Sequence, residues 1–397
     1  MKLARRAQGI GASATLAMNA RAKEMKKQGI DILSFTVGEP DFDTPEHIAE
    51  AGITAIREGF TRYTPAAGIP ELKEAICAKL KRENGLDYEP ADVVVANGAK
   101  HAIYNALQAL IDEGDEVIIP APYWVSYTEM VKLNGGVPVV VPTRAEEGFK
   151  LTPSSLKAAI TPRTKAIFIN SPNNPTGAVY SRAELEALAE ILVANEVVII
   201  ADEVYEKLLY DGATFTSMAA LGPEVKNLTV TINGVSKTYA MTGWRIGYAA
   251  APRELAQAMA NIQSHATSNP NSIAQKAAVV ALTGPQEPVQ RMLDEFARRR
   301  ELMVAGINAL PGFKCRKPEG AFYIFADVSE LFGRTLRGQK ITGSISLAEI
   351  LLVEAHVAVV PGAAFGDDRY VRFSYATSMA TIEKGLERLK EVLAEVR

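Results

Sequence analysis

A lysine beside a small-residue turn is the side chain of this 397-residue sequence best suited to covalent chemistry. Lys237 follows the β-rich run Leu228-Thr-Val-Thr-Ile232 and lies in Val235-Ser-Lys-Thr-Tyr239. Its neighbours are small or apolar, and a lysine held away from water has a lowered pKa and becomes a free amine. A free amine can condense with a carbonyl group. Lys237 is therefore a candidate nucleophile.

The usual carbonyl partner in such a site is pyridoxal phosphate (PLP), whose phosphate needs donors and positive charge. Phosphates bind well at helix N-termini, where unpaired N–H groups converge. Gly98 and Ala99 follow an apolar run and open a helical pattern, so their N–H groups suit a phosphate. Arg245 suits a bidentate contact with the same phosphate. Taken singly, this turn also fits an ordinary strand-to-helix junction, and Arg245 also fits a structural ion pair.

The PLP ring needs a carboxylate beside its nitrogen, because the ring withdraws electrons best while that nitrogen is protonated. Asp202 follows the apolar run 197–201 and is the candidate. The alternative is that Asp202 caps a helix over residues 203–210. Tyr205, and Asn174 in the loop 171–177, are placed to bind the phenolic oxygen of the ring, although that loop also fits a plain Pro/Asn turn.

Two further residues fit a cofactor face and a substrate anchor. Trp124 follows a predicted strand and suits stacking on the ring, with a place in the core as the alternative. Arg372 alternates with apolar residues in Tyr370-Val-Arg-Phe-Ser-Tyr-Ala-Thr377, so it points to the opposite side of a strand from them. Its forked guanidinium suits a carboxylate, and an exposed strand arginine is the alternative. The joint occurrence of these signals favours a PLP site.

Alternating strands and helices are the elements that would position these residues. Helical stretches at 101–111 and 182–195 lie between short apolar runs. This alternation predicts an α/β fold with a mostly parallel central sheet flanked by helices. Ligands collect beyond the carboxyl ends of such strands, where the candidate polar residues lie. The predicted buried strands are 93–96, 116–119, 137–141, 166–169, 197–201 and 228–232.

Both chain ends predict a second, smaller α+β domain. Residues 15–28 predict an amphipathic helix that ends at Gly29. We expect a large domain over residues 46–290 and a small domain formed by 1–45 and 291–397. The final third predicts helices at 289–310 and 378–396 and strands at 321–325 and 357–360.

The composition narrows the possible function. The chain is 48% hydrophobic and 22% charged with a net charge of −3, and no basic block suggests nucleic acid. Two cysteines are too few for a disulfide framework, and the four histidines show no metal-ligand spacing. The sequence shows neither a secretory signal, nor a membrane span, nor the glycine turn of a nicotinamide dehydrogenase. We expect a cytoplasmic protein without metal, nucleic-acid or membrane partners.

The motifs resemble the class I aminotransferases of the PLP fold-type I group, and most of all the bacterial aspartate aminotransferases of the branch that includes prephenate aminotransferases. The resemblance covers nearly the whole chain, from Ser13-Ala-Thr15 to the last helix. It implies a large domain and a smaller domain made from both chain ends. The motifs are Val37-Gly-Glu-Pro-Asp-Phe42, Tyr63-Thr-Pro-Ala-Ala-Gly68, Asn97-Gly-Ala-Lys-His101, Pro122-Tyr-Trp-Val-Ser126, residues 170–177, Asp202-Glu-Val-Tyr205, Ser236-Lys237, residues 241–247 and Val371-Arg-Phe-Ser-Tyr-Ala-Thr377.

The resemblance implies a role for each candidate. Lys237 would bind PLP covalently and then move a proton, while Asp202 would pair with the ring nitrogen. Tyr63 would reach the phosphate of the neighbouring subunit, which makes the active form a homodimer. The remaining implied contacts are Tyr205 and Asn174 with the phenolic oxygen, Trp124 with the ring face, Gly98, Ala99, Lys100, Ser236 and Arg245 around the phosphate, and Arg372, Asn174, Trp124 and the backbone of Gly38 with the substrate.

The resemblance also implies a dicarboxylic substrate. The more familiar aspartate aminotransferases bind the distal carboxylate with an arginine of the partner subunit, and no matching motif is present. In the similar bacterial branch a lysine at the position of Lys100 and a hydroxyl at that of Thr15 do this work, and both are present. Lys100 also fits a surface lysine at a helix N-terminus. We therefore expect an aspartate aminotransferase that passes the amino group of L-aspartate to 2-oxoglutarate in two half-reactions.

Other functions remain open on this scaffold. Relatives often have Lys-Pro before Ser-Ala-Thr where this chain has Gly11-Ala12, which puts prephenate recognition in doubt. A PLP β-lyase or a cyclopropane-forming synthase would share Lys237 and Asp202. A non-catalytic PLP-binding regulator would carry a DNA-binding module before this region, and only about 30 residues precede the Gly38 motif.

Overall fold

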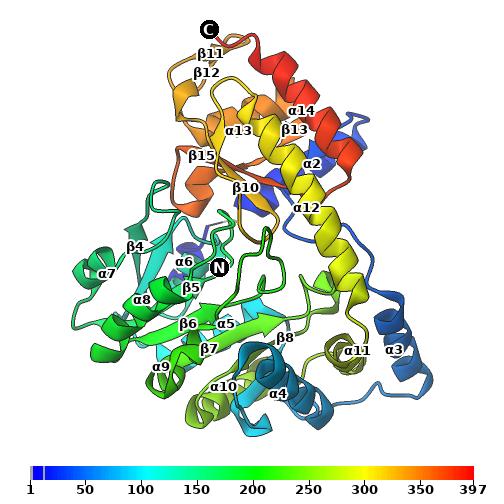
Figure 1. Ribbon diagram of the computed structural model, residues 1–397, viewed down its shortest axis with the longest axis vertical. Helices are drawn as coiled ribbons and strands as arrows, with labels where there is room; N and C mark the ends of the chain where they lie inside the picture. Colours follow the sequence, from blue (N-terminus) through cyan, green and yellow to red (C-terminus); the bar gives the residue numbers. More distant parts are fainter. Residues whose placement is uncertain (1–2, 12–13) are drawn as a thin grey trace.

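A computed structural model describes residues 3–11 and 14–397, without the side chains of residues 5, 6 and 14–16. The lower part in Figure 1 holds a large sheet between helices, and the upper part holds a small sheet with long helices. Helix α12 (Glu287–Asn308) runs from one part into the other. Helices α2 (Ala14–Lys27) and α14 (Met379–Leu393), from the two chain ends, both lie in the upper part.

The large sheet has seven strands in the order β2-β8-β7-β6-β5-β3-β4. Neighbours from β4 to β7 pair in parallel, whereas β8 is antiparallel to both β7 and β2. The predicted, mostly parallel α/β sheet is therefore confirmed. Its strands are β2 (Val93–Ala96), β3 (Glu116–Ala121), β4 (Val137–Pro142), β5 (Thr164–Asn170), β6 (Val198–Asp202), β7 (Thr229–Gly234) and β8 (Gly247–Ala250).

All six predicted strands of this sheet are present, and β8 is the addition. Its four residues, Gly247-Tyr-Ala-Ala250, are small except for one tyrosine, so they form no recognisable apolar run. They are buried nonetheless, because β8 lies between β2 and β7. Position in the sheet, more than side-chain hydrophobicity, makes this segment a strand.

Helices cover both faces of the large sheet, and the strand pleat decides which side chain meets which helix. Ile118, Ile167 and Ile199 pack in one cluster with Leu188 of α8 (Arg182–Ala194). On the opposite face, Val117, Ala166 and Ile200 belong to a second cluster. That cluster includes apolar residues of α5 (Ala99–Leu110), α6 (Ser126–Leu133) and α10 (Arg253–Ala266). Burial of both faces explains why these strands read as continuous apolar runs.

The connecting elements follow ordinary helix start and stop signals. Helix α8 begins with a capping box in which Ser181 and Glu184 exchange hydrogen bonds. Gly85, in a left-handed conformation at φ 67°, ends α4. The remaining elements of this part are α3 (Glu46–Arg57), α4 (Pro70–Asn84), η1 (Pro90–Asp92), α7 (Pro153–Ala159), η2 (Met218–Leu221), α9 (Pro223–Leu228), η3 (Thr242–Trp244) and α11 (Ser272–Thr283).

The small sheet is antiparallel, in the order β14-β15-β10-β9. The predicted strand at 357–360 is divided: β13 pairs with β1, and β14 pairs with β15. The predicted helix over 15–28 is present as α2, and Gly29 ends it at φ 85°. The other elements are α1 (Arg5–Gln8), β1 (Leu33–Ser34), β9 (Lys314–Cys315), β10 (Tyr323–Asp327), η4 (Ser329–Leu331), β11 (Thr335–Leu336), β12 (Gln339–Lys340), α13 (Ser344–Glu354), β13 (Val357–Ala358), β14 (Val360–Pro361), η5 (Gly362–Phe365) and β15 (Tyr370–Ser374).

The domain boundaries near residues 45 and 290 stay a prediction. Helix α12 begins at Glu287 and therefore crosses the second boundary without a break. Its apolar residues, such as Phe296 and Met303, belong to the same hydrophobic cluster as the strands of the small sheet. This continuous helix ties the two sheets together.

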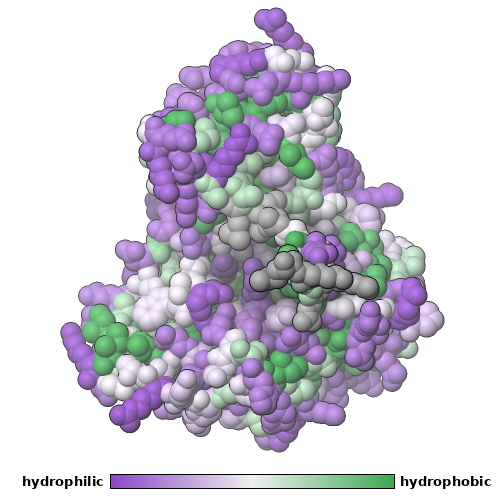
Figure 2. Space-filling model, turned by 180° about the vertical axis from the view of Figure 1, so that it is seen from behind, coloured by the Kyte–Doolittle hydropathy of each residue, from purple (hydrophilic) through white to green (hydrophobic). Residues whose placement is uncertain are grey.

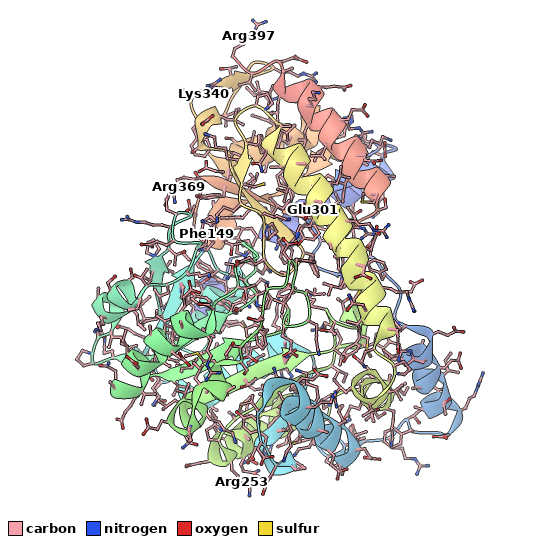
Figure 3. All side chains as sticks on the ribbon, in the orientation of Figure 1. Phe149, Arg253, Glu301, Lys340, Arg369 and Arg397 are labelled. Carbon is pink, nitrogen blue, oxygen red and sulfur yellow. The ribbon has the colours of Figure 1, made fainter. Side chains whose placement is uncertain are left out.

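The face shown in Figure 2 is mainly hydrophilic. The reverse face shows scattered hydrophobic groups among polar ones (Figure 2), and charged side chains such as Arg253, Lys340 and Arg369 point away from the body (Figure 3). Among the described residues no helix is long and apolar enough to cross a membrane.

Strand β8 and helix α5 lie so close together that one methyl group added at Gly247 is expected to destabilise the fold. A Cβ added at Gly247 would lie 2.2 Å from the backbone nitrogen of Ala99. We expect Gly247→Ala to lower the free energy of unfolding by about 1–3 kcal/mol, because backbone would have to move. Urea unfolding followed by circular dichroism measures the change. Gly243→Ala is the control, since a Cβ there meets nothing within 4 Å. Equal stability of Gly247→Ala and Gly243→Ala would contradict the expectation.

Candidate active site

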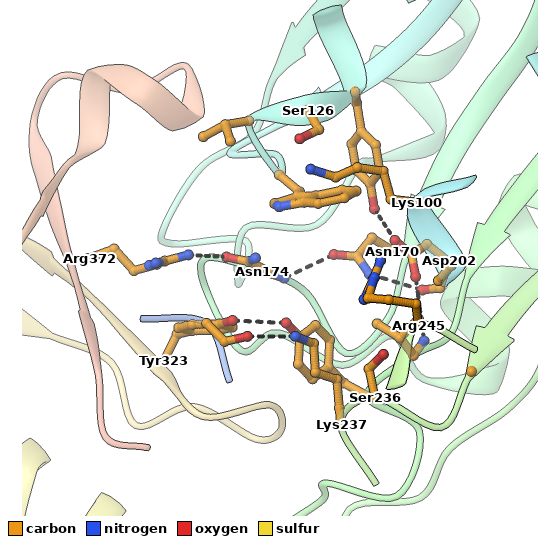
Figure 4. A pocket seen from close by; sticks show the side chains of 18 residues that line it. Lys100, Ser126, Asn170, Asn174, Asp202, Ser236, Lys237, Arg245, Tyr323 and Arg372 are labelled. Atoms are coloured by element: carbon orange, nitrogen blue, oxygen red, sulfur yellow. Dashed lines mark hydrogen bonds between the residues drawn. The ribbon is translucent and has the colours of Figure 1, made fainter. Parts of the chain in front are cut away.

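A cavity of about 300 Å³ lies at the carboxyl ends of β5, β6 and β7 (Figure 4). This is the edge at which a parallel sheet is expected to bind its ligand. The small sheet closes the cavity from the other side through Tyr323 and Arg372. The cavity brings together these sequence candidates: Gly38, Ala99, Lys100, Trp124, Asn174, Asp202, Tyr205, Ser236, Lys237, Arg245 and Arg372.

Lys237 lies three residues beyond the end of β7, and its Nζ donates a hydrogen bond to the Gly38 carbonyl at 2.5 Å. Burial above all, together with the positive charges of Arg245 and Arg372, lowers the pKa of Lys237 to about 8. The negative charge of Glu39 acts in the opposite direction. About a tenth of Lys237 is therefore a free amine at pH 7, far more than for an exposed lysine, and the free amine is the form that a nucleophile requires.

Asp202 is the last residue of β6, and its carboxylate is buried. Tyr127 donates its hydroxyl proton to Oδ2 at 2.6 Å. Burial raises the pKa of Asp202 to about 6, while the Tyr127 hydrogen bond opposes that rise. The alternative role as a helix cap is wrong, because residues 204–207 form a turn and no helix lies within 203–210. A cationic group beside Asp202 would stabilise its ionised form.

The N-terminus of α5 and Arg245 meet at one end of the cavity. Gly98 caps α5 at φ 88°, and a Cβ at this position would lie 2.3 Å from Nη2 of Arg245. Arg245, in a left-handed conformation at φ 58°, donates to the carbonyls of Thr242 at 2.8 Å and Asn97 at 3.2 Å. Two backbone carbonyls leave the guanidinium charge available to an anion. This end of the cavity therefore fits a phosphate.

Arg372 lies on β15 and is 2% exposed, so the alternative of an exposed strand arginine is wrong. Nη1 donates to Oδ1 of Asn174 at 2.9 Å, and Nη2 donates to the carbonyl of Thr36 at 2.7 Å. Nε is buried and has no hydrogen-bond partner in the part of the chain that the structure describes. A buried guanidinium bonded to neutral groups is suited to an incoming carboxylate.

Trp124 and Lys100 form one wall of the cavity. Nζ of Lys100 lies 4.8 Å from the centroid of the Trp124 ring. The Trp124 ring packs edge-on against Tyr127, with 5.4 Å between the ring centroids. Trp124 is therefore half-buried at the cavity and not enclosed in the core.

Of the other three candidates, two are not part of the cavity lining, and the side chain of the third is not described. Gly98 contacts Arg245 but does not itself line the cavity. Tyr63 is 91% exposed and lies outside the cavity of its own chain. Thr15 belongs to α2, and its side chain lies outside the described residues.

Seven lining residues were given no role of their own from the sequence, and three of them bond through their side chains to other residues of the cavity. Asn170 ends β5 next to Asp202 on β6 and begins the motif 170–177, but its side chain was assigned no contact. Tyr127 follows Trp124 by one helical turn, which is a weaker signal. Tyr323 lies in the apolar strand β10, where a tyrosine is expected in the core, so nothing in the sequence distinguishes it.

The cavity fits PLP together with a carboxylate substrate on two observations. The unpartnered Nε of Arg372 needs an acceptor, and the Gly98–Arg245 contact forms an anion cradle in which a larger residue than glycine would clash. Lys237 and Asp202 add the amine and the carboxylate that this cofactor requires. In the described residues, no group of three or more histidines, cysteines and acidic residues is placed to hold a metal ion.

Comparison with known proteins agrees with this reading. A family model described as aminotransferase class I and II matches residues 30–389. The chain is 54% identical to an aspartate aminotransferase of Geobacillus stearothermophilus, over 98% of both chains. It is 52% identical to an aspartate/prephenate aminotransferase of Cereibacter sphaeroides, over 96% of both. A crystal structure of the aspartate aminotransferase from Rhizobium meliloti superposes with a TM-score of 0.97 at 49% identity, covering 100% of each chain.

The lowered pKa of Lys237 predicts how its covalent labelling depends on pH. Only the neutral amine attacks a carbonyl, and burial sets the pKa of Lys237 at about 8. We expect the initial rate of PLP attachment to the apoprotein to rise about tenfold per pH unit below 8 and to level off above it. Borohydride reduction followed by peptide mass spectrometry measures that rate. Lys237→Ala is the control that should remain unlabelled, and attachment at another lysine with the same pH profile would contradict the assignment.

Proposed function

The chain belongs to the family of class I and II aminotransferases, and from that premise we propose that it is an aspartate aminotransferase. It transfers the amino group of L-aspartate to 2-oxoglutarate with PLP as its cofactor. The observation that carries this proposal is the convergence of Lys237, Asp202 and Arg372 in one cavity, with Lys100 on the same wall. Amino-group transfer requires an amine to bind the cofactor, a carboxylate to keep the cofactor's ring nitrogen protonated, and a cation to bind the substrate carboxylate.

Bound PLP supplies an electron sink for the charge that develops at the substrate Cα. Lys237 would hold the cofactor through Nζ and would carry a proton to and from that Cα. Asp202 keeps the ring nitrogen protonated, and its own pKa of about 6 falls again beside that positive charge. The other cofactor contacts that we propose are Tyr205 and Asn174 with the phenolic oxygen, Trp124 with the ring face, and Gly98, Ala99, Lys100, Ser236 and Arg245 with or near the phosphate.

Arg372 is the proposed anchor of the substrate α-carboxylate, with help from Asn174 and the backbone of Gly38. Asn174 already holds Nη1 of Arg372, so the guanidinium is oriented before substrate arrives. Lys100 and Thr15 are proposed to bind the distal carboxylate. Nζ of Lys100 lies over Trp124, where its charge can reach a substrate beside the cofactor. Each of the two substrate carboxylates is then bound by its own cationic side chain, Arg372 at one end and Lys100 at the other.

Tyr63 is proposed to act in the neighbouring subunit. Its side chain is 91% exposed in the single chain, although it belongs to one of the motifs of the family resemblance. Ile53 and Ile56 on α3 are also exposed, at 38% and 56%. Apolar side chains of this kind are expected at a subunit interface. A homodimer in which Tyr63 reaches the partner's phosphate site accounts for both observations.

We place the enzyme in a reducing compartment, the cytoplasm, on its cysteine chemistry. Cys77 and Cys315 are both free thiols. Disulfides are rare in reducing compartments, where free thiols persist.

Transfer to prephenate is the competing activity, since one relative with 52% identity is named for aspartate and prephenate. A β-lyase on the same scaffold would release ammonia and form no glutamate. Incubation with aspartate and 2-oxoglutarate, with oxaloacetate, glutamate and ammonia all measured, decides between these reactions. We expect oxaloacetate and glutamate in equal amounts. Repeating the assay with prephenate as the acceptor ranks the two acceptors.

The proposed distal-carboxylate contact predicts a change of substrate preference. We expect Lys100→Met to lower kcat/KM for aspartate by about 10- to 100-fold, the value of one hydrogen bond to a charged group. The value for alanine should stay within about threefold, because alanine has no distal carboxylate. Steady-state kinetics with both amino acids measures the change. Lys132→Met, at a lysine on α6 that pairs with Glu129 outside the cavity, is the control. Equal losses for aspartate and alanine would rule out this role of Lys100.

The proposed shared site predicts that Tyr63 affects cofactor binding in the dimer. We expect Tyr63→Phe to weaken PLP binding by about tenfold, the loss of one hydrogen bond to a charged phosphate. Equilibrium dialysis measures the Kd, and analytical ultracentrifugation checks that the variant is still dimeric. Thr61→Ala, at an exposed neighbour, serves as the control. A monomeric wild-type enzyme with full activity would refute the shared site.

A further inference from the structure

Tyr323 contacts both halves of the site without a role in the mechanism above. Its hydroxyl lies 2.9 Å from the hydroxyl of Tyr205. Its ring lies beneath the guanidinium of Arg372, with 4.4 Å from Cζ to the ring centroid. One side chain therefore contacts the proposed cofactor ligand and the proposed substrate anchor (Figure 4).

Strand register places Tyr323 beside Arg372. Strands β10 and β15 pair so that Tyr323 lies opposite Ser374 and Phe325 lies opposite Arg372. Tyr323 and Arg372 are thus diagonal neighbours on the same face of the small sheet, within reach of long side chains. A rigid pair of strands fixes the distance between them. Tyr323 is 1% exposed, so its ring is enclosed by its neighbours.

The hydroxyl of Tyr323 is also confined by its surroundings. A Cβ at Gly38 would lie 2.7 Å from that oxygen, so only glycine leaves room for it. The Gly38 carbonyl is in turn the acceptor for Nζ of Lys237. Tyr323 is therefore held between the segment that contacts Lys237 and the hydroxyl of Tyr205.

A similar arrangement elsewhere in the molecule provides a comparison. The ring of Tyr210 lies beneath the guanidinium of Arg300, also at 4.4 Å. Tyr210 donates its hydroxyl to the Ala321 carbonyl at 2.6 Å, and Arg300 pairs with Asp211 at 2.7 Å. Arg372, in contrast, bonds an amide oxygen and a backbone carbonyl. The charge of Arg300 is already paired with the carboxylate of Asp211. The partners of Arg372 are neutral, so its charge is suited to receive an anion.

We propose that Tyr323 is a positioning residue that orients the Tyr205 hydroxyl toward PLP and the Arg372 guanidinium toward the substrate carboxylate. This inference rests on the proposed function. The bond between the two hydroxyls uses one of their two protons. When Tyr323 donates to the Tyr205 oxygen, the Tyr205 proton is free for the phenolic oxygen of the cofactor. Donation by Tyr323 also makes Tyr205 a stronger donor, because hydrogen bonds in a chain polarise one another.

Two substitutions separate the roles of the hydroxyl and the ring. Tyr323→Phe removes the donor and keeps the ring, whereas Tyr323→Leu removes both. Tyr210→Phe and Tyr210→Leu are matched controls, because they remove the same groups from a tyrosine that does not line the cavity. All four variants are loaded with PLP. The pH midpoint of the visible cofactor absorption and the Kd of succinate, a dicarboxylate without an amino group, are then measured for each.

We expect Tyr323→Phe to raise the pH midpoint by about half a unit, since a weaker Tyr205 donor stabilises the negative phenolic oxygen less. Its Kd for succinate should remain within about twofold of the wild type. Tyr323→Leu should show the same upward shift and, without the ring beneath Arg372, a Kd about tenfold higher. Both Tyr210 variants should match the wild type in midpoint and Kd.

The inference is overturned if both Tyr323 variants keep the pH midpoint and the Kd of the wild type. It is also overturned if the Tyr210 variants change as much as the Tyr323 variants, because that result would indicate a general loss of packing. These outcomes differ from failure of the proposed function. If the wild-type protein shows no visible PLP absorption and no borohydride-fixed label at Lys237, both proposals fall. If the wild type transfers the amino group of aspartate while Tyr323→Phe and Tyr323→Leu behave as it does, only the positioning role is refuted.

Discussion

Removal of charged groups from water, in one cavity between two sheets, is the constraint on which this molecule depends. Burial lowers the pKa of Lys237 to about 8 and raises that of Asp202 to about 6, so each group is poised near neutral pH. Arg372 is buried with neutral partners. Such an arrangement costs stability until opposite charges arrive. The proposed cofactor, with its phosphate and cationic ring, and the proposed dicarboxylic substrate would supply those charges.

The two sheets contribute different parts of the site. The large sheet supplies the groups that face the proposed cofactor, because Asp202 ends β6 and Lys237 follows β7. The small sheet supplies Arg372 and Tyr323 from adjacent strands. Helix α12, which continues from one part to the other, fixes the sheets relative to each other. Any change in that packing would alter the distance between cofactor ligands and substrate anchor together.

Glycines set the closest approaches around the cavity. At Gly98 and Gly38, an added Cβ would meet Arg245 at 2.3 Å and Tyr323 at 2.7 Å. These residues determine where the anion cradle and the Tyr205–Tyr323 pair lie. Both positions need glycine because the side chain of Arg245 or of Tyr323 fills the space that a Cβ would occupy. Gly98 also has a φ of 88°, which glycine adopts without strain. Substrate chemistry thus depends on residues that have no functional group of their own.

Local sequence determined six strands of the large sheet, the helix between Gly98 and Leu110, and most of the residues that line the cavity, because apolar runs followed by polar residues mark the ends of buried parallel strands. It did not reveal β8, whose four small residues form a strand only between β2 and β7. Nor did it reveal the division of 357–360 between two pairings. Tyr323 joined the site only through the register of β10 and β15 and the packing of Tyr205 against it. The bond between Tyr205 and Tyr323 joins residues 118 positions apart, and no local pattern records such contacts, since only the folded chain brings them together.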